Sequence, residues 1–184
     1  MTDSYLNLRH ALQRRDKSLR EKVVTLDEAA SFVKDGDSVG VGGSMMSRTP
    51  TALIWALIRA GRKNLTCSRS IITSDGDLLL GSGISKHIIW GVSKVMRHHI
   101  ETGAATFEEW SHMAMGMRFR AGAMGLPFMP IRSMLGSDVQ TLRPEAKEMV
   151  CPFTGDRLLL VPALNPDVAI IHVQRCDAYG NAQI

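Results

Sequence analysis

The sequence predicts an open α/β fold, with a mostly parallel sheet and helices on both of its faces. Short runs of apolar residues alternate along the chain with longer segments whose apolar residues recur every three or four positions. The runs Leu158–Val161 and Val168–Val173 consist largely of leucine, isoleucine and valine, as expected for strands covered on both faces of a parallel sheet. Strands that alternate with amphipathic helices are typical of an open α/β domain.

The first predicted elements are an N-terminal arm and a capped helix. Residues 1–22 mix basic and acidic side chains without an apolar run, so we expect a basic arm or solvated helix there rather than a signal peptide. The α/β domain is expected over residues 23–184. Within it, Thr25 and Glu28 have the spacing of a capping box, which predicts a helix from Leu26 to Val33.

A glycine-rich segment, S-V-G-V-G-G-S-M-M-S-R-T-P, occupies Ser38–Pro50. Its first part, Ser38–Val41, is expected to be extended. Thr49 is expected to cap the next helix and Pro50 to take the first helical position, where its missing N–H costs nothing. The buried stripe of that helix is expected to contain Ile54, Leu57 and Ile58.

Two further extended segments are predicted at Leu65–Thr73 and Ile84–Val92, on either side of the turn-rich sequence S-D-G-D-L-L-L-G-S-G. Thr106–Glu109 repeats the capping-box pattern and predicts the start of a long helix that Gly125 ends. The apolar face of that helix is expected to contain Trp110, Met113, Ala114, Met117, Ala121 and Met124.

Composition argues against several classes of protein. No apolar run approaches the roughly 18 residues of a transmembrane helix, so no membrane partner is expected. The net charge of +4 is modest and the basic residues are not interleaved with aromatic ones, so nucleic acid is not expected as a partner. Cys67, Cys151 and Cys176 are odd in number and lack metal-ligand spacing, which favours reduced thiols in a cytoplasm and no metal site.

The glycine-rich segment fails the two common tests for a phosphate-binding loop. It contains no lysine for a Walker motif, and Met45 stands where a dinucleotide fingerprint requires its third glycine. Two interpretations stay open. The backbone at Gly42 and Gly43 binds a carboxylate or an oxyanion, or the two glycines only relieve crowding in a tight strand-to-helix turn.

Other chemically active side chains have simpler explanations. His98 and His99 are expected in a solvated turn, and His172 is expected to be a hydrogen-bonded histidine of the core. The numerous methionines fit a core or a subunit interface. Glu108 and Glu109 fit helix caps, and Glu109 is also a candidate to face a site. No Ser-His-Asp or Cys-His arrangement can be assembled from spacing.

Five segments, in order, resemble one family. D-G-D-S-V-G-V-G-G (35–43), S-R-T-P with its helix and N-L-T (47–66), and S-D-G-D-L-L-L-G-S-G (74–83) are similar to segments of the α subunit of family I CoA transferases. The same holds for R-F-R-A-G-A-M-G-L-P-F (118–128) and D-V-A-I-I-H-V-Q-R-C-D-A-Y-G-N (167–181). The resemblance covers residues 22–184 and is greatest for the glutaconate CoA-transferase branch of these α subunits.

The resemblance implies an α/β subunit that pairs with a homologous β subunit, as αβ or (αβ)₂. A glutamate of the β subunit would attack an acyl-CoA thioester and pass CoA to a carboxylic acid, with CoA as substrate and no other cofactor. This chain lacks the nucleophile motif, so no catalytic nucleophile is assigned to it. Its contribution would be Gly42, Gly43 and Ser44 lining the acyl pocket, and Arg48 either clamping a carboxylate or pairing with the partner subunit.

Two alternatives accompany this hypothesis. A branch of the same family hydrolyses ring-opened CoA thioesters, and Glu109 would then be the candidate base. The third possibility is a non-catalytic assembly subunit or fragment, because family α chains continue beyond the D-x-x-G-N segment whereas this sequence stops at Ile184. We therefore expect the domain to be incomplete at its C-terminal end relative to the family.

Overall fold

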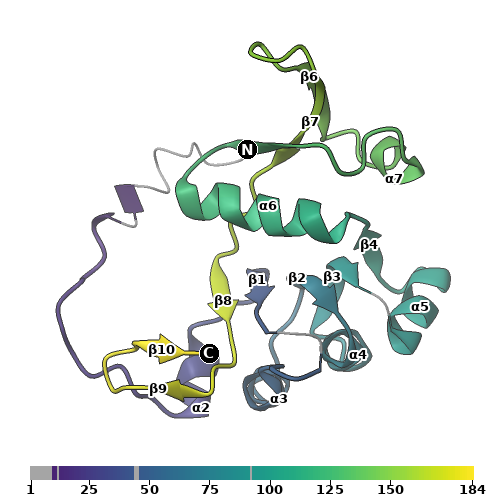
Figure 1. Cartoon of the computed structure of the whole chain (residues 1–184). Coiled ribbons are helices and arrows are strands. Elements are labelled where there is room, and N and C mark those ends of the chain that lie inside the picture. Colours follow the sequence, from purple (N-terminus) through teal and green to yellow (C-terminus); the bar gives the residue numbers. More distant parts are fainter. Residues whose placement is uncertain (1–9, 12, 44–45, 92) are drawn as a thin grey trace. The chain divides into compact units, whose positions relative to one another are not determined.

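The computed structural model describes residues 10–11, 13–43, 46–91 and 93–184. The chain forms two compact units, which are described separately below. The parallel-sheet unit contains Glu21–Trp110 and Pro166–Ile184, and the hairpin unit contains Met1–Arg20 and Ser111–Asn165 (Figure 1).

The parallel-sheet unit is built on a sheet of five parallel strands in the described part of the chain, in the order β4-β3-β2-β1-β8. From β1 the chain proceeds outward through β2, β3 and β4, and it later returns to the opposite side of β1 as β8. This arrangement confirms the open α/β class and the parallel sheet. The strands are β1 (Ser38–Val41), β2 (Leu65–Ile72), β3 (Ser85–Gly91), β4 (Thr106–Glu108) and β8 (Val168–Ile170).

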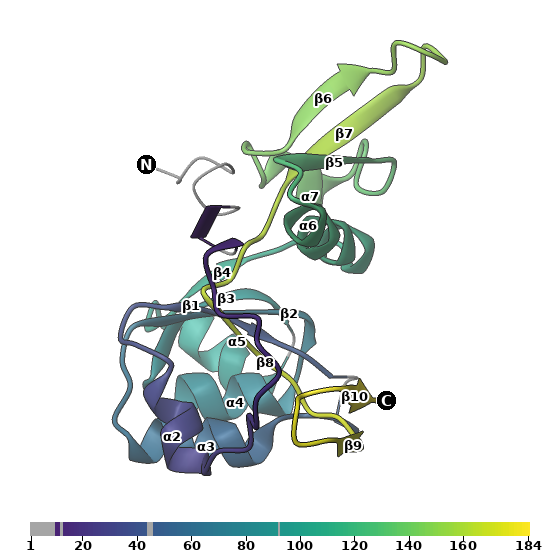
Figure 2. The ribbon, with the colours of Figure 1, turned by 90° about the vertical axis from the view of Figure 1, so that its left-hand side faces the viewer.

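The helices of this unit lie together on one face of the sheet, whereas the sequence predicts helices on both faces (Figure 2). Successive parallel strands that advance in one direction, joined by right-handed crossovers, place their connecting helices on the same side. Between this helical layer and the sheet lies the core, in which Ile54, Leu57, Leu79 and Ile88 are fully buried. The helices are α2 (Leu26–Ser31), α3 (Thr51–Arg59), α4 (Ser74–Gly81) and α5 (Lys94–Glu101).

The predicted starts of the first two helices are confirmed to within one residue. At α2 the Glu28 N–H donates to Thr25 Oγ1 at 3.2 Å, and the Thr25 N–H donates to Glu28 Oε2 at 2.9 Å, so the capping box is present. At α3 the prediction for Thr49 and Pro50 is wrong by one position. Pro50 is the residue that precedes the helix, and the Thr49 carbonyl accepts a hydrogen bond from the Thr51 N–H at 2.8 Å.

The segment 74–83, predicted as a turn, instead forms helix α4. Its aspartates and glycines favour turns locally, but a helix in this crossover position buries its leucines against the core. Leu79 and Leu80 are buried in the core, and the Asp75 carboxylate accepts a hydrogen bond from the Thr73 N–H at 2.8 Å just before the helix. Tertiary packing therefore overrides a weak local preference.

The second predicted capping box, Thr106–Glu109, is also wrong. Thr106–Glu108 forms β4, in which Thr106 pairs with His87 of β3 in parallel register. The following helix begins later, at His112, and Ser111 is its cap, with Ser111 Oγ accepting from the Ala114 N–H at 3.1 Å. A Thr-x-x-Glu pattern can occupy a strand when a neighbouring strand supplies its backbone partners.

The hairpin unit contains helix α6 and a three-stranded antiparallel sheet, in the order β5-β7-β6 in the described residues. The run Leu158–Val161 lies in β7, so its assignment to a parallel sheet is wrong. A short turn over residues 151–156 joins β6 to β7, and only antiparallel strands can be joined so closely. The elements are α6 (His112–Met124), β5 (Phe128–Ile131), α7 (Asp138–Thr141), β6 (Lys147–Val150) and β7 (Arg157–Pro162).

The buried face of α6 differs from the predicted apolar stripe. Met113 and Met124 are 54% and 57% exposed, whereas Arg118 is buried and its Nε donates to the Pro162 carbonyl at 3.1 Å. Gly125, with φ +68°, ends the helix as predicted. The residues of α6 that are buried are Ala114, Met115, Arg118 and Ala121.

The C-terminal residues form a small antiparallel hairpin, β9 (Arg175–Cys176) and β10 (Ala182–Gln183). Its turn is organised by Asp177, whose Oδ1 accepts from the Tyr179 and Asn181 N–H groups, each at 2.9 Å. The Asn181 side chain donates to the other carboxylate oxygen and, with the backbone donors, holds the pKa of Asp177 below its usual value. This geometry explains the D-x-x-G-N spacing as a carboxylate-centred turn.

Two glycines of α6 provide a test of the packing in the hairpin unit. A Cβ at Gly122 would lie 2.6 Å from the Leu164 carbonyl oxygen and 2.5 Å from Asn165 Oδ1, whereas a Cβ at Gly116 would meet nothing within 4 Å. We expect Gly122→Ala to lower the free energy of unfolding by about 1–3 kcal/mol through overpacking. Gly116→Ala should raise it by about 0.5–1 kcal/mol, because alanine favours a helix. Urea denaturation measures both, and equal effects of the two substitutions would contradict this packing.

Candidate functional site

The candidate site lies at the carboxyl ends of β1 and β8, where the strand order of the parallel sheet reverses. In open α/β sheets, ligands bind outside the carboxyl ends of the strands at such a switch point. Gly42 and Gly43 follow β1 at this position, and Ile171 and His172 follow β8. The Gly42 N–H donates to the Ile170 carbonyl at 2.8 Å and so extends the pairing of the two strands by one residue.

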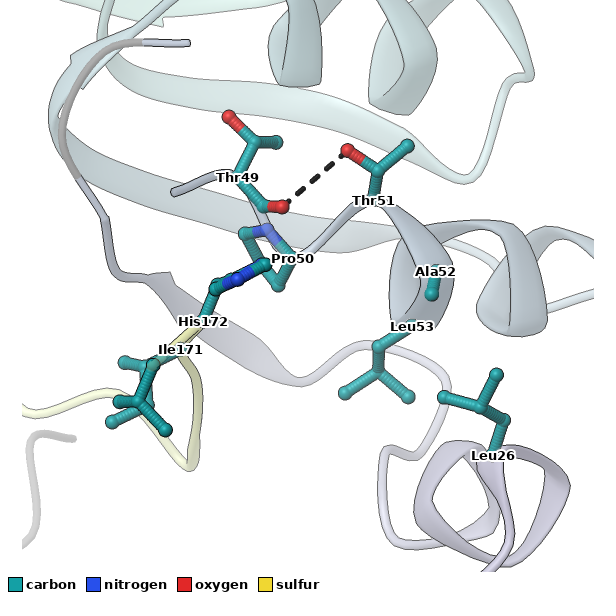
Figure 3. Close-up of a pocket in the computed structure, with 9 residues that line it drawn as sticks. Leu26, Thr49, Pro50, Thr51, Ala52, Leu53, Ile171 and His172 are labelled. Carbon is teal, nitrogen blue, oxygen red and sulfur yellow. Dashed lines mark hydrogen bonds between the residues drawn. The ribbon is translucent and has the colours of Figure 1, made fainter. Parts of the chain in front are cut away.

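A cavity of about 540 Å³ opens beside this switch point. Its wall is largely apolar, and the polar groups come from Thr49, Thr51 and His172 (Figure 3). A volume of this size and a mostly apolar lining are typical of sites for small organic ligands. The lining residues are Leu26, Thr49, Pro50, Thr51, Ala52, Leu53, Ile171, His172 and Val173.

His172 is one of the lining residues of this cavity, which corrects the expectation of a core histidine. Strand β8 ends at Ile170, two residues before the predicted core position, and the His172 side chain is exposed. His172 and Pro50, the residue that precedes α3, both line the cavity (Figure 3). The sequence offered no signal for this position, because an apolar run of this length is compatible with a longer strand.

The glycines are required by close packing within the protein. A Cβ on Gly42 would lie 2.2 Å from Ile171 Cγ2. Gly43 has φ +130°, and a Cβ there would lie 2.0 Å from the Arg48 carbonyl oxygen and 2.9 Å from Arg69 Nη2. The tight-turn interpretation therefore has direct support, and the Gly42 N–H is engaged by β8. Ligand binding by these residues stays a prediction.

The other predicted binding residues are Ser44 and Arg48. Ser44 lies outside the described residues. Arg48 is half-buried and immediately precedes the cavity residue Thr49. Among the residues that the structure describes, Arg48 has no ion-pair partner, so its guanidinium is available to an anion.

A buried ion pair lies beneath the glycines. Arg69, in the middle of β2, is 2% exposed, and its Nη1 donates to Oδ2 of the fully buried Asp75 at 2.6 Å. The same Nη1 lies 3.5 Å from Thr49 Oγ1. We did not predict this pair from the sequence, although an arginine within the apolar strand L-T-C-S-R-S-I-I, six residues before an aspartate, is the signal that could have revealed it.

The two adjacent glutamates, predicted together as helix caps, have different environments. Glu108 Oε1 lies 3.1 Å from His87 Nε2, and its Oε2 accepts from Trp110 Nε1 at 2.9 Å. Glu109 borders a second cavity of about 410 Å³, together with Arg97 and Phe107. Glu109 follows β4, three strands from β1, a spacing of about 14 Å across the sheet. The structure therefore does not bring it beside the glycines.

His98 and His99 lie in the last turn of α5 rather than in a loop. In the described ranges, no group of three His, Cys, Asp or Glu side chains could hold a metal ion, and no helix is long and apolar enough to cross a membrane. Cys67 is fully buried in β2, and burial raises the pKa of its thiol to about 12.

Comparison with known proteins places this geometry in context. The family model described as "Coenzyme A transferase" matches residues 23–184. The chain is 37% identical over 172 residues to the A subunit of 3-oxoadipate CoA-transferase from Pseudomonas knackmussii, covering 87% of this chain and 61% of that protein. It is 32% identical over 188 residues to the cholesterol ring-cleaving hydrolase IpdA subunit of Rhodococcus jostii, covering 90% of this chain and 60% of that protein.

The crystal structure of glutaconate coenzyme A-transferase from Acidaminococcus fermentans superimposes with a TM-score of 0.80 at 32% identity. It matches 89% of this chain and 60% of that chain. The chain thus spans about three fifths of the length of these relatives.

Substitution of Gly43 tests whether the turn is as crowded as the structure indicates. Gly43→Ala should lower the free energy of unfolding by about 3 kcal/mol or more, because backbone strain and a clash with the Arg48 carbonyl add. Gly61→Ala is the matched control. Its φ is +67° but its Cβ would meet nothing within 4 Å, so only the strain of about 1–2 kcal/mol is expected. Denaturant titration measures the free energy of unfolding of both variants. A similar decrease at the two positions would contradict the crowding around Gly43.

Proposed function

This chain belongs to the coenzyme A transferase family, and from that premise we propose that it is the α-subunit part of a heteromeric CoA transferase. The proposed reaction moves CoA from an acyl-CoA thioester to a carboxylic acid. The family match over residues 23–184 and the similarity to transferase A subunits support this proposal. We further propose that its partner is a homologous β subunit. The proposed location is the cytoplasm, where the thiols of this chain would remain reduced.

The proposed chemistry begins on the partner. A β-subunit glutamate attacks the thioester carbonyl, the CoA thiolate leaves, and a glutamyl anhydride forms. The thiolate then attacks the glutamyl carbonyl of the anhydride and releases the first carboxylate, which leaves a glutamyl-CoA thioester. The acceptor carboxylate reverses these two steps and carries the CoA away.

The observation that carries the proposal is the switch-point cavity, whose lining includes Thr49, the residue directly after Arg48 in the chain. An anhydride requires a site from which water is excluded, and the wall around Pro50, Leu53 and Ile171 is apolar. A carboxylate substrate requires a positive group, and Arg48 has no ion-pair partner among the described residues. The chain thus offers an acyl pocket and an anion contact, while the nucleophile is supplied by the partner.

Hydrolysis of a CoA thioester is the alternative. Two observations support hydrolysis. Glu109 borders a cavity and could activate water, and the chain is similar to a hydrolase subunit. Glu109 lies three strands away from the switch point, however, so it could not act on a thioester held in the switch-point cavity. This separation favours the transferase.

Acceptor dependence distinguishes the two reactions. The chain, co-expressed with the product of the neighbouring gene, should convert acetate or another carboxylate into its CoA thioester at the expense of the acyl-CoA and should release no free CoA. Hydroxylamine or borohydride should trap a glutamyl-CoA thioester on the β subunit. Release of CoA without an acceptor, lost in Glu109→Gln, would instead establish the hydrolase. A stable complex without either activity would leave the assembly-subunit hypothesis.

The proposed role of Arg48 gives a second test. Arg48→Met should raise the KM for the carboxylate acceptor about tenfold, because a charge-assisted contact is lost. Arg59→Met is the control, since Arg59 lies on α3 with an exposed partner, Asp27, at 3.7 Å. An unchanged KM together with weaker binding of the β subunit would show that Arg48 pairs with the partner instead.

A further inference from the structure

One guanidinium lies close to both ends of the segment that joins β1 to α3. Nη2 of Arg69 lies 2.9 Å from the position that a Cβ on Gly43 would occupy, at the start of the segment. Nη1 of the same side chain lies 3.5 Å from Thr49 Oγ1, at its end. The Arg69 side chain thus spans the base of the glycine-rich turn, on the side opposite to solvent.

Arg69 is itself held in place by the adjacent turn after β2. Its Nη1 donates to Asp75 Oδ2 at 2.6 Å, while Asp75 Oδ1 accepts from the Thr73 N–H at 2.8 Å. Both side chains of the pair are almost completely buried. Planar guanidinium and carboxylate groups in such a setting allow little rotation, because any movement would leave a buried charge unpaired.

The two arginines of this region, Arg69 and Arg48, differ in whether a carboxylate neutralises their charge. The charge of Arg69 is compensated by Asp75, so Arg69 does not compete for an anionic ligand. Arg48, which follows the glycines in the same segment, has no such partner among the described residues. A fixed position of Thr49 also restricts the backbone position of Arg48, which directly precedes it in the chain.

We propose that Arg69, oriented by Asp75, is the positioning residue of the switch-point site. It sets the distance between the two ends of the β1–α3 segment and thereby places Arg48 and the Thr49–Pro50 wall of the cavity. It does not touch substrate. The kinetic consequence of this inference rests on the proposed transferase function, whereas the structural consequence can be measured on the chain alone.

The double variant Arg69→Met/Asp75→Leu tests the structural consequence. Replacement of a buried ion pair by apolar residues of similar volume commonly preserves folding, so the core should remain intact. The thiol of Cys67, buried two positions before Arg69, reports this directly by staying unreactive toward a thiol reagent. Amide hydrogen exchange in peptides covering residues 42–50 should accelerate about tenfold. Arg132→Met/Asp156→Leu, the same exchange at an exposed pair of the hairpin unit, should leave it unchanged.

The kinetic consequence is measured with the β subunit present. The double variant should lose about a hundredfold in kcat with a smaller change in the KM for acyl-CoA, as expected when a remote change misplaces reacting groups. A folded double variant with wild-type exchange over residues 42–50, or with wild-type kcat, would overturn the proposal. Absence of turnover in the wild type would refute the transferase function, and the exchange measurement would still decide the role of Arg69.

Exposure of Cys67 in the double variant would show that the core has opened. The exchange measurement is then made on the single variant Arg69→Lys instead. Lysine keeps the charge opposite Asp75, but a single ammonium that pairs with Asp75 cannot fill the space beside both Gly43 and Thr49 as the guanidinium does. Faster exchange over residues 42–50 with Cys67 protected supports the positioning role. Wild-type exchange in a folded Arg69→Lys protein contradicts it.

Discussion

Pairing of β1 with strands on both sides is the constraint on which the parallel-sheet unit depends. This four-residue strand joins β2, which follows it closely, to β8, which lies about 130 residues later in the sequence. Two hydrogen bonds join Ser38, the first residue of β1, to Asp167, the residue before β8. The Ser38 N–H donates to the Asp167 carboxylate at 2.9 Å, and the Asp167 N–H donates to the Ser38 carbonyl at 2.9 Å. Because the two neighbours of β1 are reached in opposite directions, their loops separate and leave room for a ligand.

The site combines this opening with an unusually constrained turn. A Cβ on Gly42 would clash with Ile171, the residue after β8, and a Cβ on Gly43 would clash with the Arg48 carbonyl and lie 2.9 Å from the Arg69 guanidinium. The glycines therefore serve the packing of the protein first, and any contact with a ligand is made by a backbone whose position is already determined. Burial of an ion pair costs desolvation free energy, and its presence beside this turn is consistent with the positioning role proposed for Arg69.

Local signals in the sequence were sufficient for several elements. The Thr25–Glu28 capping box, the strand Ser38–Val41 and the stop at Gly125 each depend on the chemistry of a few consecutive residues, and all three are confirmed. The family resemblance could likewise be found from ordered short motifs. The candidate site could be predicted only in part, because Gly42, Gly43 and Arg48 lie in one segment, whereas His172 and Arg69 come from distant strands.

The α/β class, the positions of β1, β2, β3, β7 and β8, and the place of the glycine-rich turn can be read from the sequence, since these follow from hydrophobic periodicity and local hydrogen bonding. Tertiary contacts, in contrast, are required for the helix at residues 74–81, the strand at Thr106–Glu108 and the antiparallel pairing of β7. In each case the local preference is weak or ambiguous, and a partner distant in the sequence supplies the missing burial or hydrogen bonds. The same reason explains Arg69, whose charge is tolerable in a strand only because Asp75 lies opposite it in the folded chain.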